Sequence, residues 1–119
     1  EDKTLLCTDS LAIAGTDIKE GVMSGTEFIV EDEVCKLKDR SAFAGSIATA
    51  DRLVRVMTKE CGYDMVTAVK MITETPAKIA KINAGELENG YRADVVVFDE
   101  DINIKSVFVN GLNVFNFAK

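Results

Sequence analysis

A carboxylate at the end of a short apolar run is the first candidate for chemistry in this sequence. Residues 5–7 are apolar and predict a strand over residues 4–9, which Asp9 ends. In an α/β enzyme, a side chain at the carboxyl end of a strand points into the mouth where active sites form. The small and aliphatic residues 10–15 then let the chain turn away. Asp9 is therefore the candidate catalytic residue.

The usual partners of such an aspartate are missing. The 119 residues include no histidine, which removes the most frequent general base and a frequent metal ligand. The three cysteines, Cys7, Cys35 and Cys61, are widely spaced and match neither a disulfide framework nor a zinc site. We expect them to be buried free thiols in a reducing cytosol, and therefore expect a cytoplasmic protein.

The composition is that of an ordinary globular chain, with 47% hydrophobic and 29% charged residues. A net charge of −6 argues against a broad nucleic-acid footprint, which needs a basic patch. No apolar run approaches the roughly 20 residues that a membrane span requires. We therefore expect neither nucleic acid nor a membrane among the partners.

Helical periodicity predicts three helices in the middle of the chain. Ser46 is expected to cap the first, whose apolar stripe lies within residues 47–61. Asp64 is expected to cap the second. The third is expected to begin with Thr75 as its cap and Pro76 at the first helical position, where a missing N–H costs nothing.

Strand signals flank these helices on both sides. The pair Asn110-Gly111 is the strongest hairpin turn signal in the chain. The helical part and the β-rich tail meet near residue 84, so we expect a boundary between residues 1–83 and 84–119. The predicted strands, with a hairpin turn at residues 31–32, are residues 27–30, 33–37, 93–99, 104–109 and 112–117.

The tail carries a recognisable motif. Gly85, Gly90 and the pair Ala93-Asp94 precede a valine-rich strand, and the helix before them carries the pair Pro76-Ala77. This pattern resembles the carboxy-terminal tail of the amidohydrolase superfamily. From its position we expect Asp94 to accept hydrogen bonds from turn amides rather than to take part in catalysis.

The resemblance implies an α/β fold, a metal-dependent (β/α)8 barrel flanked by a small β-sandwich built from both chain ends. Residues 1–83 would be the carboxy-terminal part of the barrel, with its last strand, a β-hairpin insert and helices. Residues 84–119 would be strands of the sandwich.

The front half resembles the sugar-phosphate deacetylases of this superfamily, and the likeness extends over nearly the whole chain. It implies that Asp9 is the catalytic aspartate after the eighth barrel strand, which takes a proton from a metal-bound water and returns one to the leaving amine. Phe43, Ala44 and Gly45 match a loop that contacts the amino-sugar phosphate substrate through backbone groups. Ser46 would be mainly a helix cap.

The departures from the family pattern concern the metal. The family binds a divalent ion, zinc or similar, through a glutamate and two histidines that have no counterpart here, and Asp9 is the one possible ligand in this chain. Phe43 stands where leucine is usual. We therefore expect a carboxy-terminal fragment of a larger enzyme that binds no metal and has no activity by itself. Apolar helix faces without neighbours predict a homodimer or a higher oligomer.

Two other interpretations stay open. The chain would also fit another amidohydrolase, of the adenine deaminase or dihydroorotase type. Alternatively, it is a self-contained, non-catalytic α+β binding or assembly module, in which Asp9 is only a loop carboxylate.

Overall fold

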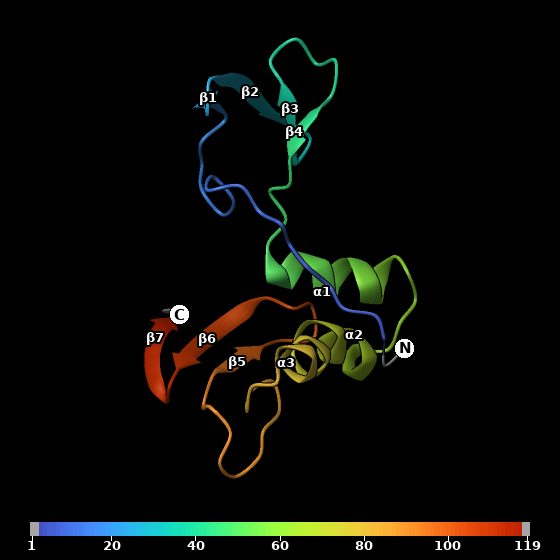
Figure 1. Ribbon diagram of the computed structural model, residues 1–119, viewed down its shortest axis with the longest axis vertical. Helices are drawn as coiled ribbons and strands as arrows, with labels where there is room; N and C mark the ends of the chain where they lie inside the picture. The colour runs from blue at the N-terminus through green and yellow to red at the C-terminus, as the bar shows by residue number, and fades with distance from the viewer. Residues whose placement is uncertain (1–2, 118–119) are drawn as a thin grey trace. The chain divides into compact units, whose positions relative to one another are not determined.

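The computed structural model describes residues 3–117, which form two compact units (Figure 1). One unit is Thr8–Ala50; the other combines the described residues up to Cys7 with those from Asp51 onward. In chain order, the elements are β1 (Glu20–Met23), β2 (Thr26–Glu31), β3 (Val34–Leu37), β4 (Phe43–Gly45), α1 (Ala50–Lys59), α2 (Met65–Ile72), α3 (Glu74–Ala80), β5 (Val95–Phe98), β6 (Ile104–Val109) and β7 (Leu112–Asn116).

The unit Thr8–Ala50 contains an antiparallel sheet with the strand order β1-β2-β3-β4. The predicted hairpin is confirmed as β2 and β3, with its turn one residue later than expected, because Asp32 and Glu33 both adopt left-handed conformations (φ 52° and 60°) that match a two-residue turn. Phe28 and Cys35 are the buried residues on these strands. Strands β1 and β4 were not predicted.

In the other unit, α1 and α2 enclose a small apolar core. Val54, Ala68 and Ile102 form its buried cluster. The predicted cap of α2 is confirmed, since the Asp64 carboxylate accepts a hydrogen bond of 3.0 Å from the backbone N–H of Thr67. No helix among residues 3–117 is long and apolar enough to cross a membrane.

Ile102 enters this core from the turn between β5 and β6. It is 1% exposed and has a left-handed backbone (φ 64°), which is costly for a β-branched residue. The guanidinium of Arg55 donates a hydrogen bond of 2.9 Å to the carbonyl oxygen of Ile102. The Asp99 carboxylate accepts hydrogen bonds from the backbone N–H groups of Asp101 and Asn103, so the turn is held from inside as well as from α1.

Two predicted helix starts are wrong. Helix α1 begins at Ala50, because the backbone of Ser46 is engaged in a β-bridge rather than in a helix end. Helix α3 begins at Glu74 after Thr73, which places Pro76 at the third helical position. Proline is still tolerated there, since the N–H groups of the first helical turn have no intrahelical partner.

The strand predicted over residues 4–9 is not formed. Its backbone is tied by a hydrogen bond of 2.9 Å from the N–H of Leu6 to the carbonyl oxygen of Met71, and no strand within residues 3–117 lies beside it to pair with. The prediction that all three cysteines are buried is also wrong. Cys35 is buried, but Cys7 in this unpaired segment and Cys61 after the end of α1 are exposed free thiols.

The tail forms the antiparallel sheet β5-β6-β7, close to the predicted ranges. Asn110 and Gly111 form the turn between β6 and β7 with φ 50° and 75°. This turn is attached to the chain before β5, because the Asp94 carboxylate accepts a hydrogen bond of 2.9 Å from the N–H of Asn110, and the Ala93 carbonyl accepts one of 2.8 Å from Gly111. The expected structural role of Asp94 is therefore confirmed.

Helices α1–α3 and strands β5–β7 belong to one compact unit in this chain. The boundary between residues 1–83 and 84–119 concerns the division of a larger protein into barrel and sandwich, and it stays a prediction.

Gly85 is the glycine at which a side chain would clash most severely with the backbone. Its φ is 81°, and a Cβ there would lie 2.5 Å from the carbonyl oxygen of Thr73. We expect Gly85→Ala to lower the free energy of unfolding of the protein by about 2–4 kcal/mol, since backbone strain and a backbone clash add. Gly90→Ala is the matched control, because Gly90 has φ 87° and nothing within 4 Å of its Cβ position. Urea unfolding checks this; equal losses in both variants would contradict it.

Asp94 should make stability depend on pH. The N–H of Asn110 and then the guanidinium of Arg92 hold the pKa of Asp94 below its usual range. This contribution is present above the unfolded pKa of about 3.9 and is lost as the pH falls through the lower folded value. Asp94→Asn should lower the urea midpoint at pH 7, and the difference from the parent protein should shrink below about pH 3.5. Exposed Glu88→Gln is the control; a pH-independent difference would refute the charge effect.

Candidate active site

A parallel β-bridge brings the two predicted site segments together. Ser10 pairs with Ser46, and the N–H of Leu11 donates a hydrogen bond of 2.9 Å to the carbonyl oxygen of Ser46. Because the pairing is parallel, the residues that precede the bridge, Asp9 and Gly45, lie next to each other along the two segments. The predicted catalytic residue and the predicted substrate loop are therefore neighbours, although they are far apart in sequence.

The side chains of the bridged serines reinforce this junction. The Ser10 hydroxyl donates a hydrogen bond to the carbonyl oxygen of Ala48. The Ser46 hydroxyl accepts one of 3.1 Å from the N–H of Ala48. We call Ser10, Ser46 and Ala48 the serine clasp. The sequence did not indicate it, because the bond between Ser10 and Ala48 joins distant segments through groups that carry no local pattern.

The predicted loop Phe43, Ala44 and Gly45 is a short edge strand, β4, paired with β3. The register shifts between Cys35 and Lys36, so that β4 carries a bulge, a feature that often occurs beside active sites. The side chain of Phe43 is 77% exposed, and Ala44 is half-buried. The edge of this strand leaves backbone groups available to a ligand.

Gly45 couples the strand to the segment that carries Asp9. Its φ is 151°, and a Cβ there would lie 2.8 Å from three carbon atoms of the Leu11 side chain. Leu11 therefore occupies the space that any other residue at position 45 would need. Glycine is required here both by the backbone conformation and by this close approach.

Asp9 is exposed and has a left-handed backbone (φ 44°). Aspartate tolerates this conformation better than most residues, and strained backbone is often found at functional sites. Within residues 3–117, no hydrogen bond or ion pair engages its carboxylate. The group is thus available to accept or donate a proton.

The described residues do not form a metal centre by themselves. The described part of the chain contains no group of three histidine, cysteine, aspartate or glutamate side chains that could hold an ion. A single exposed carboxylate, Asp9, does not fit the three or four ligands that a protein metal site requires.

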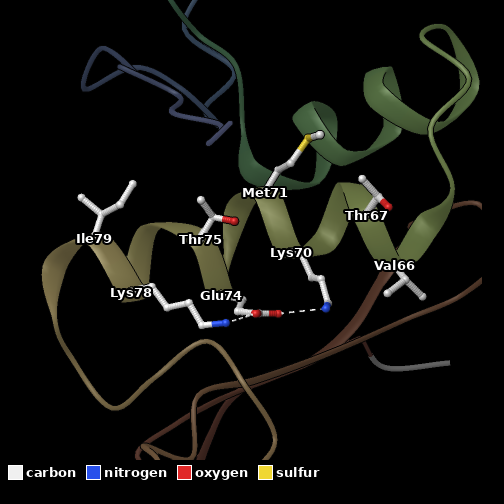
Figure 2. A pocket seen from close by; sticks show the side chains of 8 residues that line it. All are labelled: Val66, Thr67, Lys70, Met71, Glu74, Thr75, Lys78 and Ile79. Carbon is white, nitrogen blue, oxygen red and sulfur yellow. Dashed lines mark hydrogen bonds and ion pairs between the residues drawn. The ribbon is translucent and has the colours of Figure 1, made fainter. Parts of the chain in front are cut away.

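A groove on α2 and α3 has none of the predicted site residues in its lining (Figure 2). Lys70 and Lys78 extend toward Glu74 from either side, and the Lys70–Glu74 pair is 3.2 Å long. Both lysines, Lys78 first, hold the pKa of Glu74 below its usual range. Because these charges are already paired, we do not assign the groove a ligand. The spacing of four residues between Glu74 and Lys78 on α3 could have indicated their pair from the sequence, whereas Lys70 lies on α2. The groove is lined by Val66, Thr67, Lys70, Met71, Glu74, Thr75, Lys78 and Ile79.

The chain is similar in sequence and in structure to known enzymes of one family. The model of the amidohydrolase family matches residues 2–114. The chain belongs to this family. A structural comparison confirms the α/β fold. The chain superposes on a solved N-acetylglucosamine-6-phosphate deacetylase from Pasteurella multocida with a TM-score of 0.88. That alignment has 29% sequence identity and covers 97% of this chain and 31% of the deacetylase, so the barrel is not closed within the described residues.

Two curated relatives represent two activities of the family. The N-acetylglucosamine-6-phosphate deacetylase of Caenorhabditis elegans is 31% identical over 115 residues, which are 93% of this chain and 27% of that protein. The adenine deaminase of Methanosphaera stadtmanae is 32% identical over 100 residues, 82% of this chain and 17% of that protein. The chain therefore spans less than a third of the length of these relatives.

The close packing of Leu11 against Gly45 predicts that a side chain at position 45 would disturb the pairing of the two segments. We expect Gly45→Ala to displace the Leu11 side chain and to weaken the hydrogen bond from the Leu11 N–H to Ser46. Hydrogen exchange followed by mass spectrometry should then report faster exchange in peptides that contain Leu11. Gly25→Ala is the matched control, because Gly25 has φ 80° in the same unit and nothing within 4 Å of its Cβ position. Unchanged exchange in Gly45→Ala would show that the junction does not depend on this glycine.

Proposed function

We propose that the protein carrying this chain hydrolyses the N-acetyl group of N-acetylglucosamine 6-phosphate to give glucosamine 6-phosphate and acetate. The observation that carries the proposal is the bridge between Ser10 and Ser46, which holds the Asp9 segment beside the strand Phe43–Gly45. The likeness to the worm and Pasteurella deacetylases over more than nine-tenths of the chain supports this substrate class.

Asp9 is the proposed general base and general acid. In hydrolysis of the amide, its carboxylate accepts a proton from the attacking water as the C–O bond forms. The protonated carboxyl then gives that proton to the nitrogen of the amine as the C–N bond breaks, so the residue returns to its starting state. Its exposed position and the absence of a partner on its carboxylate, within residues 3–117, are suited to this exchange.

The family implies a divalent metal ion, zinc or a similar ion, which activates water as a nucleophile when bound. The described residues do not form such a site, so we assign its ligands to parts of the enzyme outside this chain. Among the described residues, Asp9 is our candidate for a contribution to it.

The proposed sugar-binding group is the backbone of Phe43, Ala44 and Gly45. An edge strand offers N–H and C=O groups in a fixed row, and these can hydrogen-bond to sugar hydroxyls. At Gly45 the lack of a side chain lets the Leu11 side chain pack against the backbone, which holds this end of the strand in place.

For the chain on its own, we propose no hydrolase activity and a tendency to self-associate. The metal ligands expected of the family are missing from its sequence, and β7 exposes apolar side chains such as Leu112 (71%) and Val114 (59%). Exposed apolar patches of this kind favour association.

The substitution Asp9→Asn tests the assignment in the full-length protein. We expect kcat for N-acetylglucosamine 6-phosphate to fall by about 10²–10⁴-fold, the usual contribution of a general acid-base group, while KM changes little. Asp17→Asn, at an exposed aspartate of the same unit, should retain the parent kcat. Acetate release measures both.

Adenine is assayed in parallel, because an adenine deaminase also matches most of the chain. Ammonia release from adenine, without acetate release from N-acetylglucosamine 6-phosphate, would show that the substrate is adenine and would refute the proposed function. Full activity of Asp9→Asn would refute the role of Asp9.

A further inference from the structure

We infer that Ser10 is a positioning residue that fixes the Asp9 carboxylate relative to the substrate strand through its hydrogen bond to Ala48. The inference rests on the proposed function and adds to it a residue that acts through another. Ser10 follows Asp9 directly and is a member of the serine clasp.

On the amino side of Asp9, the backbone N–H of Leu6 donates a hydrogen bond to the carbonyl oxygen of Met71, but the segment forms no strand within the described residues. Residues 4–9 pair with no strand, and Asp9 itself has a left-handed backbone. Among the described residues, the segment after Asp9 is the one attached to the strand Phe43–Gly45. Ser10 is the first residue of this segment, and it is held both by the backbone bridge to Ser46 and by its own hydroxyl.

The two attachments of this segment have separate effects. The bond from the Leu11 N–H to the Ser46 carbonyl keeps the segments paired, and it does not involve the Ser10 side chain. The hydroxyl bond to Ala48 restrains rotation of the residue next to Asp9. Loss of the hydroxyl should thus leave the pairing in place and release the position of Asp9.

Ser10 is also exposed, and a hydrogen bond in such a place contributes little to stability. A reduction of the rate in a protein that remains folded would therefore report on the position of Asp9 rather than on unfolding. Small errors in the position of a catalytic group have large effects on rate.

The experiment compares Ser10→Ala and Ser10→Thr in the full-length protein. We expect Ser10→Ala to lower kcat for N-acetylglucosamine 6-phosphate by about tenfold to a hundredfold with KM nearly unchanged, because the group that moves acts on the transition state. Ser10→Thr keeps the hydroxyl and should recover most of the lost kcat.

Thr16→Val is the matched control. The Thr16 hydroxyl donates a similar hydrogen bond of 2.7 Å, to the carbonyl oxygen of Ile13 in the same unit, but it is not part of the serine clasp. This variant should retain the parent kcat. An equal loss of kcat in Thr16→Val would attribute the effect to general loosening and overturn the inference.

Hydrogen exchange in the peptide that contains Asp9 and Ser10 gives a readout besides activity. Ser10→Ala should exchange faster there, with the thermal midpoint nearly unchanged. Unchanged exchange, or faster exchange with the parent kcat, would overturn the positioning role. If the parent protein releases no acetate, the proposed function fails, and the exchange result alone decides whether Ser10 restrains Asp9.

Discussion

The parallel bridge between Ser10 and Ser46 is the constraint on which the candidate site depends. It joins a segment without strand partners to the end of an antiparallel sheet, and it fixes which residues become neighbours across the junction. Gly45 admits the Leu11 side chain at this point, and the clasp adds side-chain bonds to the backbone ones. Without this pairing, Asp9 would be one exposed carboxylate among many on an acidic chain.

Features set by local chemistry could be predicted from the sequence, and features set by distant partners could not. The Asn110-Gly111 turn and the Asp64 cap depend on neighbouring residues, and both are present. Ser46 has the same capping chemistry as Asp64, but its backbone is already committed to the bridge, so α1 begins later. The strand expected over residues 4–9 has no partner to pair with in the described chain, and apolar composition cannot supply one.

The same distinction applies to the site. The identity of Asp9 and of the Phe43–Gly45 segment followed from residue types and a family resemblance, and the structure brings these segments together without testing their roles. The serine clasp could not be predicted, since Ala48 takes part through its backbone alone. Ile102 was equally hidden from the sequence, because a left-handed isoleucine anchored by Arg55 has no local signature.

The bridge also closes a loop, with consequences for how this region can change in length. Strands β1–β3 leave the junction after Leu11 and return to it at β4, so the chain between forms an excursion with both ends tied. Insertions and deletions far from the tied ends would leave those ends in place, and lengthening a loop costs little entropy. The Ser24-Gly25 turn between β1 and β2 is thus a natural point for lineages to diverge, or for an engineered domain to be inserted.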